Sequence, residues 1–168
     1  MITADDVITD FNGDYEWVVT EEFVKQRNAL AKKLKGKGKI RRADCTAAEY
    51  ILAEHIESFE LTPITQWHND LQCKNTEEFL DAKQYAKIGV KVGDAPITNV
   101  KEGNIHYFPV WKWLPNNWYP ATGPEGLVVD QKVKIRLLGL VPAQLAVENL
   151  YLDKESDKRF MFPEELNI

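Results

Sequence analysis

Few side chains in this sequence stand at the spacings that known catalytic chemistry requires. The two serines, Ser58 and Ser156, lie outside any GxSxG turn, which argues against a serine hydrolase. Cys45 follows a basic stretch and precedes an expected helix start, and both features favour a thiolate. A cysteine in this setting is more often a small half-buried residue, so we predict no cysteine nucleophile.

A metal site would draw on the three histidines, the two cysteines and the acids. Zinc sites usually show CxxC or HExxH spacing, because such pairs place two ligands on one local element. His68 and Cys73, five residues apart, are the nearest approach to that pattern. The sequence therefore predicts no metal site and no cofactor.

The strongest charge feature is a basic segment at residues 32–42, KKLKGKGKIRR, which holds seven of the 21 basic residues and no acid. It shares glycines with phosphate-binding loops, but it follows an expected helix and lacks the terminal GK[ST]. We interpret it as a cationic loop that, with cations of an expected strand, could neutralise nucleic-acid phosphates. The residues of this alternative site are Lys37, Lys39, Arg41, Arg42, Lys132, Lys134 and Arg136.

The main candidate for a binding surface is the aromatic stretch of residues 106–120, HYFPVWKWLPNNWYP. It holds three of the five tryptophans and two of the six tyrosines. Trp and Tyr concentrate in binding hot spots, because a large rigid ring with a polar atom buries much area. The alternative is a core strand followed by a turn. We expect the interaction surface at Trp111, Trp113, Trp118 and Tyr119, with Trp118 exposed and Trp111 or Trp113 anchoring the loop.

Helix-start signals dominate the first half of the chain. Apolar residues at a 3.6-residue period predict helices over residues 21–35 and 47–60. Thr20 precedes two glutamates, which suit a helix N-terminus. The pairs with capping-box spacing are Thr3 with Asp6, Thr46 with Glu49, and Asn75 with Glu78.

Each of the two predicted helices carries one polar residue on its apolar stripe. These residues are Arg27 and His55. An unpaired buried charge is costly, so we expect both side chains to be mostly buried, with His55 neutral and hydrogen-bonded.

Strand signals follow residue 89. Residues 131–137 alternate apolar and basic side chains, the clearest strand pattern in the chain. Residues 105–113 also alternate, but Pro109 predicts an edge position or a bulge. Residues 145–152 fit a strand or a helix equally well. The pattern predicts an α+β fold, with a helical N-terminal half packed on a small, mainly antiparallel sheet from the C-terminal half, in a single domain over residues 1–168.

Composition narrows the class of protein further. A net charge of −5 and a pI near 5.3 argue against a wholly basic nucleic-acid binder. The first ten residues are acidic where an export signal would be basic, and the longest mostly apolar stretch, residues 137–147, is too short to span a bilayer. These features predict a cytoplasmic protein with no membrane partner.

Three functions fit the sequence, and we favour the first. It is a non-enzymatic accessory, inhibitor or immunity-type partner of another protein, because catalytic spacings are absent and the chain is acidic. The second is a nucleic-acid-binding protein that uses the basic segment and the strand cations. The third is a small enzyme whose site assembles dispersed residues such as His55, Glu54 and His106.

Overall fold

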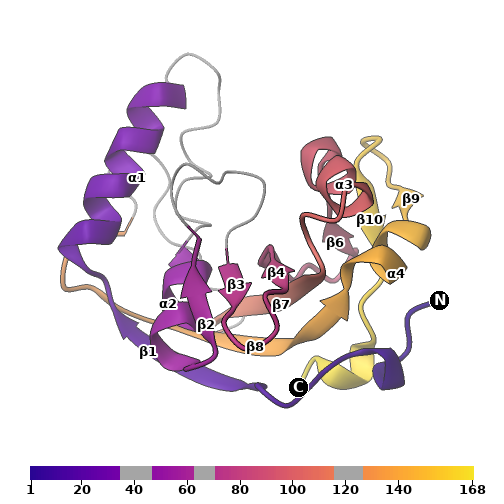
Figure 1. The fold of residues 1–168 in the computed structure, drawn as a ribbon, viewed down its shortest axis with the longest axis horizontal. Coiled ribbons are helices and arrows are strands. Elements are labelled where there is room, and N and C mark those ends of the chain that lie inside the picture. The colour runs from indigo at the N-terminus through magenta and orange to yellow at the C-terminus, as the bar shows by residue number, and fades with distance from the viewer. Residues whose placement is uncertain (35–46, 63–70, 116–126) are drawn as a thin grey trace.

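The computed structural model describes residues 1–34, 47–62, 71–115 and 127–168 (Figure 1). Its helices are η1 (Ala4–Asp6), α1 (Glu21–Leu34), α2 (Ala47–His55), α3 (Asp94–Lys101), α4 (Ala143–Glu148) and η3 (Glu164–Leu166). Its strands are β1 (Gly13–Val18), β2 (Phe59–Leu61), β3 (Leu71–Cys73), β4 (Phe79–Leu80), β5 (Lys83–Gln84), β6 (Val90–Lys91), β7 (Tyr107–Leu114), β8 (Lys132–Pro142), β9 (Tyr151–Leu152) and β10 (Lys158–Phe160).

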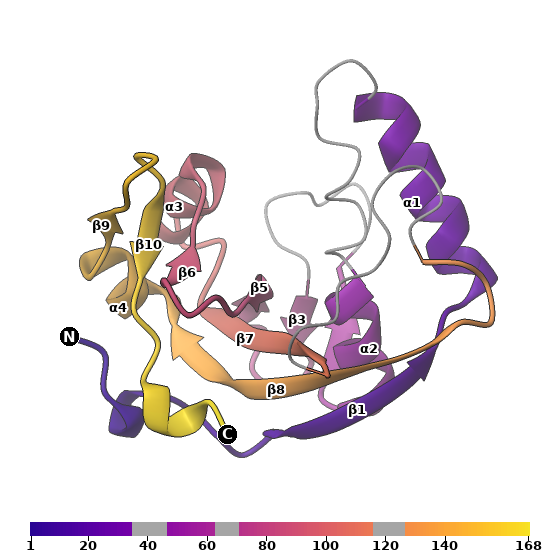
Figure 2. The ribbon, with the colours of Figure 1, turned by 180° about the vertical axis from the view of Figure 1, so that it is seen from behind.

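The described strands form two sheets. The larger has the order β1-β8-β7-β4-β3-β2, with β5 beside β7, and the smaller has the order β6-β10-β9. Figure 1 shows β1, β8 and β7 sweeping in a curve, with α1 standing at one end and the smaller sheet with α3 and α4 at the other. Figure 2 shows the same curve from behind. Helix α2 packs against both β1 and β2, the two outer strands of the larger sheet. It therefore bridges the gap where that curled sheet does not close.

The predicted helical N-terminal half is wrong. Strands β1 to β5 lie in that half, and β1 and β4 pair directly with β8 and β7 from the second half. The helix expected over residues 47–60 ends at His55, and Phe59–Leu61 forms β2. The helix start expected at Asn75 is a turn before β4, where Glu77 has a positive φ of 58°. Capping signals also suit turns, because their side chains bond nearby backbone N–H groups in either structure.

Other local predictions are confirmed. Helix α1 begins after Thr20, whose Oγ1 accepts a hydrogen bond from the Phe23 N–H at 3.1 Å. The alternating residues 131–137 fall largely within β8. Residues 145–152 are divided between both alternatives, since α4 ends at Glu148 and β9 begins at Tyr151.

Strand β7 is central, although Pro109 predicted an edge. Pro109 lies opposite Leu140 of β8. The N–H and the carbonyl of Leu140 both bond to Ile8, on the side of β8 away from β7. The missing N–H of Pro109 therefore faces away from β8, toward the neighbouring chain between β4 and β5. Residues 81 and 82 of that neighbour belong to no strand, so Pro109 lies at the break in pairing between β4 and β5. The expected bulge is present between Val110 and Trp111.

The apolar side chains form two cores, and β7 and β8 supply both. The first core contains Trp17, Phe23 and the buried face of α2, together with Trp111 and Trp113. The second joins Phe108 and Val110 of β7 and Leu138 and Val141 of β8 to α3, α4 and the smaller sheet. Both faces of β7 are buried. The long strands β7 and β8 therefore connect the first core with the second.

Candidate functional site

The four aromatic residues predicted to bind a partner divide into two pairs. Trp111 and Trp113 are buried, with exposed fractions of 1% and 3%, and their rings meet edge to face at 4.9 Å. Both anchor the end of β7 in the first core, as expected of at least one of them. Neither ring offers surface to a partner. Trp118 and Tyr119 lie outside the described residues.

The residues that follow the aromatic segment in the sequence, from Leu127 on, form a tight turn with exposed valines. Leu127 is buried, while Val128 and Val129 are 52% and 42% exposed. The Val128 carbonyl accepts a hydrogen bond from Gln131 N–H, and Asp130 has a positive φ of 69°. Turns normally carry Gly, Asn, Asp or Pro at their centre, and β-branched residues there are unusual.

A third exposed valine lies beside this turn. Val18, at the end of β1, is 47% exposed. Its neighbour Val19 accepts a backbone hydrogen bond from Asp130 and donates one to Gln131. These bonds hold the end of β1 and the turn together. We call Val18, Val128 and Val129 the valine rim.

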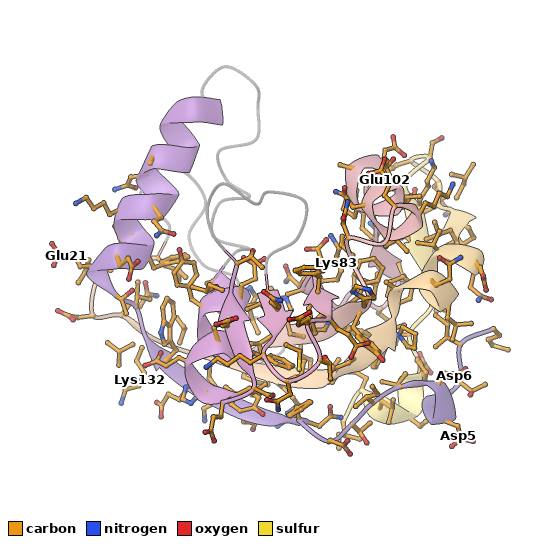
Figure 3. All side chains as sticks on the ribbon, in the orientation of Figure 1. Asp5, Asp6, Glu21, Lys83, Glu102 and Lys132 are labelled. Carbon is orange, nitrogen blue, oxygen red and sulfur yellow. The ribbon has the colours of Figure 1, made fainter. Side chains whose placement is uncertain are left out.

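Three exposed acidic residues lie close to the valine rim along the chain. Glu21 and Glu22 begin α1 immediately after β1, and both are exposed, as is Asp130. Figure 3 shows Glu21 and Lys132 at this end of the molecule, near the foot of α1. The Lys132 ammonium pairs with Glu16 at 3.6 Å. The described surface here combines exposed apolar groups with net negative charge.

The strand cations of the nucleic-acid alternative are mostly neutralised. Besides the Lys132 pair, the Arg136 guanidinium contacts both Asp14 carboxylate oxygens, at 2.6 and 3.0 Å. This pairing lowers the pKa of Asp14. Lys134 is exposed between them. The basic residues Lys37, Lys39, Arg41 and Arg42 lie outside the described residues.

The residues of the dispersed enzyme site do not form one constellation. His55 ends α2, and its Nε2 lies 2.6 Å from the Glu16 carbonyl oxygen on the outer edge of β1. His106 instead accepts a hydrogen bond from the Phe79 N–H at 3.0 Å and stacks on the Phe79 ring. Glu54 is exposed on α2. Each histidine has its own structural partners.

The expected burial of His55 is wrong. Its side chain is exposed, although it has the hydrogen bond that was expected. The ring lies beside Tyr15, with centroids 5.5 Å apart. The helical stripe ends one turn earlier than predicted, so His55 faces the edge of the sheet and not its interior. The side chain of Arg27 lies outside the described residues.

A hollow of about 630 Å³ opens beside His55, at the gap between β1 and β2. We call it the seam hollow, because it lies where the curled sheet fails to close. Its walls come from the segment before β1, the turn after α2 and the turn after β3. The lining residues are Asp10, Phe11, Asn12, Tyr15, His55, Ile56, Glu57, Ser58, Lys74 and Asn75. No local sequence signal predicted it, since its three segments meet only in the tertiary fold.

Ser58 in this hollow has a buried hydroxyl oxygen with no hydrogen-bond partner in the described part of the protein. An unsatisfied buried hydroxyl costs free energy, so we expect Ser58→Ala to raise the free energy of unfolding by about 1 kcal/mol. Chemical denaturation measures this change. Ser156→Ala, at an exposed position, is the control and should change stability by less than about 0.5 kcal/mol. A loss of stability in Ser58→Ala would show that the hydroxyl has a partner.

The described residues bring together no group of three or more His, Cys, Asp or Glu side chains able to hold a metal ion. Cys73 is half-buried on β3, while Cys45 and His68 lie outside the described residues. Across the same described ranges, none of the helices has the length and apolar character needed to cross a bilayer.

Comparisons with known proteins found no match. No protein family, curated protein or solved structure resembles the chain closely enough to indicate its relatives. Its function therefore has to be argued from the residues and their arrangement alone.

Proposed function

We propose that this chain is a non-enzymatic binding protein that binds another protein through the valine rim and through aromatic residues of the sequence segment 116–120. The observation that carries the proposal is the exposure of Val18, Val128 and Val129 in one corner of the fold. Exposed apolar groups gathered beside one another mark interaction surfaces, because a partner that covers them gains about 25 cal/mol per Å².

The sequence supplies further residues suited to a binding surface. Trp118 and Tyr119 lie in the segment between the buried end of β7 and the buried Leu127. Pro115 and Pro120 restrict the unbound chain, which lowers the ordering cost when a partner arrives. A surface with rigid aromatic anchors and an apolar border has the composition of a binding hot spot.

Charge indicates the kind of partner. Glu21, Glu22 and Asp130 are exposed and lie within a few residues of the valine rim along the chain. A partner surface with an apolar centre and Lys or Arg at its border would match both features, and its association would be faster at low ionic strength. These carboxylates would repel a strongly acidic partner, such as a nucleic acid, at this corner.

The experiment compares binding of the wild-type chain with variants in this corner. The partner is first captured from the native cell on the immobilised chain and then purified. Trp118→Ala should weaken its binding by about 2 kcal/mol or more, with little loss of stability. The double variant Val128→Ser with Val129→Ser should weaken it roughly tenfold, because it removes exposed apolar area while keeping the turn.

Leu152→Ser is the matched control, because Leu152 is 65% exposed but lies on the smaller sheet. It should leave binding unchanged. If it weakens binding as much as the valine variant, the surface is elsewhere. A loss of about 3 to 5 kcal/mol of stability in Trp118→Ala would show that Trp118 belongs to the core and not to the binding surface.

Capture of DNA or RNA that is abolished by replacing Lys37, Lys39, Arg41 and Arg42 with Gln would instead support the nucleic-acid alternative.

A further inference from the structure

The seam hollow has preformed walls. The Phe11 and Phe59 rings meet across the gap with centroids 5.1 Å apart. The Lys74 N–H donates to the Ser58 carbonyl at 2.7 Å, which joins the turn after β3 to the turn after α2. On the other side, His55 is joined to the Glu16 carbonyl of β1 at 2.6 Å. Sites for small molecules are usually formed before the ligand arrives, and a volume of about 630 Å³ falls in their range.

The polar side chains of the hollow are largely unused. Asp10, Glu57, Lys74 and Asn75 form no side-chain hydrogen bond or ion pair within the described ranges of the chain. The buried Ser58 hydroxyl is also without a partner there. Elsewhere on the same structure exposed charges do find partners, as Lys158 does with Asp94 at 2.8 Å. Sites for small molecules combine an apolar lining with a few polar groups that orient the ligand, and the exposed Asp10, Glu57, Lys74 and Asn75 are available for that role.

The charges of the lining define the class of ligand. The hollow has two carboxylates, Asp10 and Glu57, and one ammonium, Lys74. A dianion such as phosphate would be repelled by the two carboxylates, and a simple cation would meet the ammonium. A molecule with both an ammonium and a carboxylate can pair with each, and the rings of Phe11 and Tyr15 supply an apolar wall.

We propose that the seam hollow binds a small zwitterion, a free α-amino acid, through Asp10 and Glu57 at its ammonium and Lys74 and Asn75 at its carboxylate. This site is separate from the valine rim, and either proposal can fail without the other. The proposal concerns binding only and includes no chemical step.

The test is a nuclear magnetic resonance titration of the full chain with each of the twenty standard L-amino acids at millimolar concentration. At least one should shift the amide signals of residues 55–58 and 74–75 in a saturable way. Its N-acetyl derivative, which lacks the ammonium, and its carboxamide, which lacks the carboxylate, should each bind roughly tenfold more weakly or worse. Absence of saturable shifts for all twenty would overturn the proposal.

Substitutions of lining residues test whether the ligand binds in the seam hollow. Glu57→Gln and Lys74→Met, both at exposed positions, should each weaken binding roughly tenfold without unfolding the chain. Lys101→Met, exposed on α3, is the matched control for Lys74→Met and should bind as the wild type does. Equal binding by the blocked derivatives, an unchanged affinity in both variants, or tighter binding of glucose or inorganic phosphate at these residues would each contradict the zwitterion assignment. The valine-rim variants should leave this titration unchanged.

Discussion

Trp111→Ala is expected to lower the free energy of unfolding by about 3 to 5 kcal/mol. Its ring is 1% exposed and packs edge to face against Trp113 in the first core. It also lies on β7, which pairs with β8 on one side and with β4 and β5 on the other. Truncation removes the buried area and leaves a cavity that central strands cannot close by moving apart.

Urea or guanidinium unfolding followed by tryptophan fluorescence and circular dichroism measures this loss. Val129→Ala is the control, because Val129 is 42% exposed, and it should change stability by no more than about 0.5 kcal/mol. A change below about 1 kcal/mol in Trp111→Ala would show that the Trp111 ring is not packed in the first core.

Gly139→Ala is expected to destabilise the fold by about 3 kcal/mol or more. Gly139 has a φ of +150°, which side-chain-bearing residues rarely adopt. An added Cβ would lie 2.3 Å from Val7 Cγ1 and 3.2 Å from the Ile8 carbonyl oxygen. It would therefore push away the N-terminal segment that pairs with β8 through Ile8 and Leu140. Thermal unfolding should show a clearly lower midpoint.

Gly103→Ala is the matched control for backbone strain alone. Gly103 also has a positive φ, +81°, but nothing lies within 4 Å of the position its Cβ would take. Its loss should be limited to about 1 to 2 kcal/mol, the cost of the left-handed conformation. If both variants lose the same stability, the close approach of the N-terminal segment to β8 contributes nothing.

Lys112 shows how tertiary structure changes the meaning of a local pattern. It alternates with Trp111 and Trp113, so the strand pattern places it on the opposite face, where a lysine normally meets solvent. That face is covered by the chain after η3, and the Lys112 ammonium donates to the Asn167 side-chain oxygen at 2.6 Å. Lys112 is 7% exposed, and burial lowers its pKa. Nothing within β7 predicts this cover, which comes from residues more than fifty positions away.

The sequence by itself determined the elements that keep one hydrophobic periodicity over many residues or that begin with a capping residue. Helix α1 follows from its apolar stripe and the Thr20 cap, and β8 follows from its alternation. The sequence also indicated that Trp111 or Trp113 would anchor the aromatic segment, although it placed both in the interaction surface, where the structure buries them. In each case the information lies within a few residues of the element.

Only the tertiary structure decided the short strands, the position of β7 and the seam hollow. Strands of two or three residues such as β4 and β5 have no period to detect, and they form because β7 offers them backbone partners. Pro109 is tolerated in a central strand because its neighbour is interrupted opposite its missing N–H. The seam hollow exists because a curled sheet stops short of closing, which brings Asp10, Ser58 and Lys74 together from distant parts of the chain. Pairing between distant strands is a property of the whole chain, so no local pattern contains it.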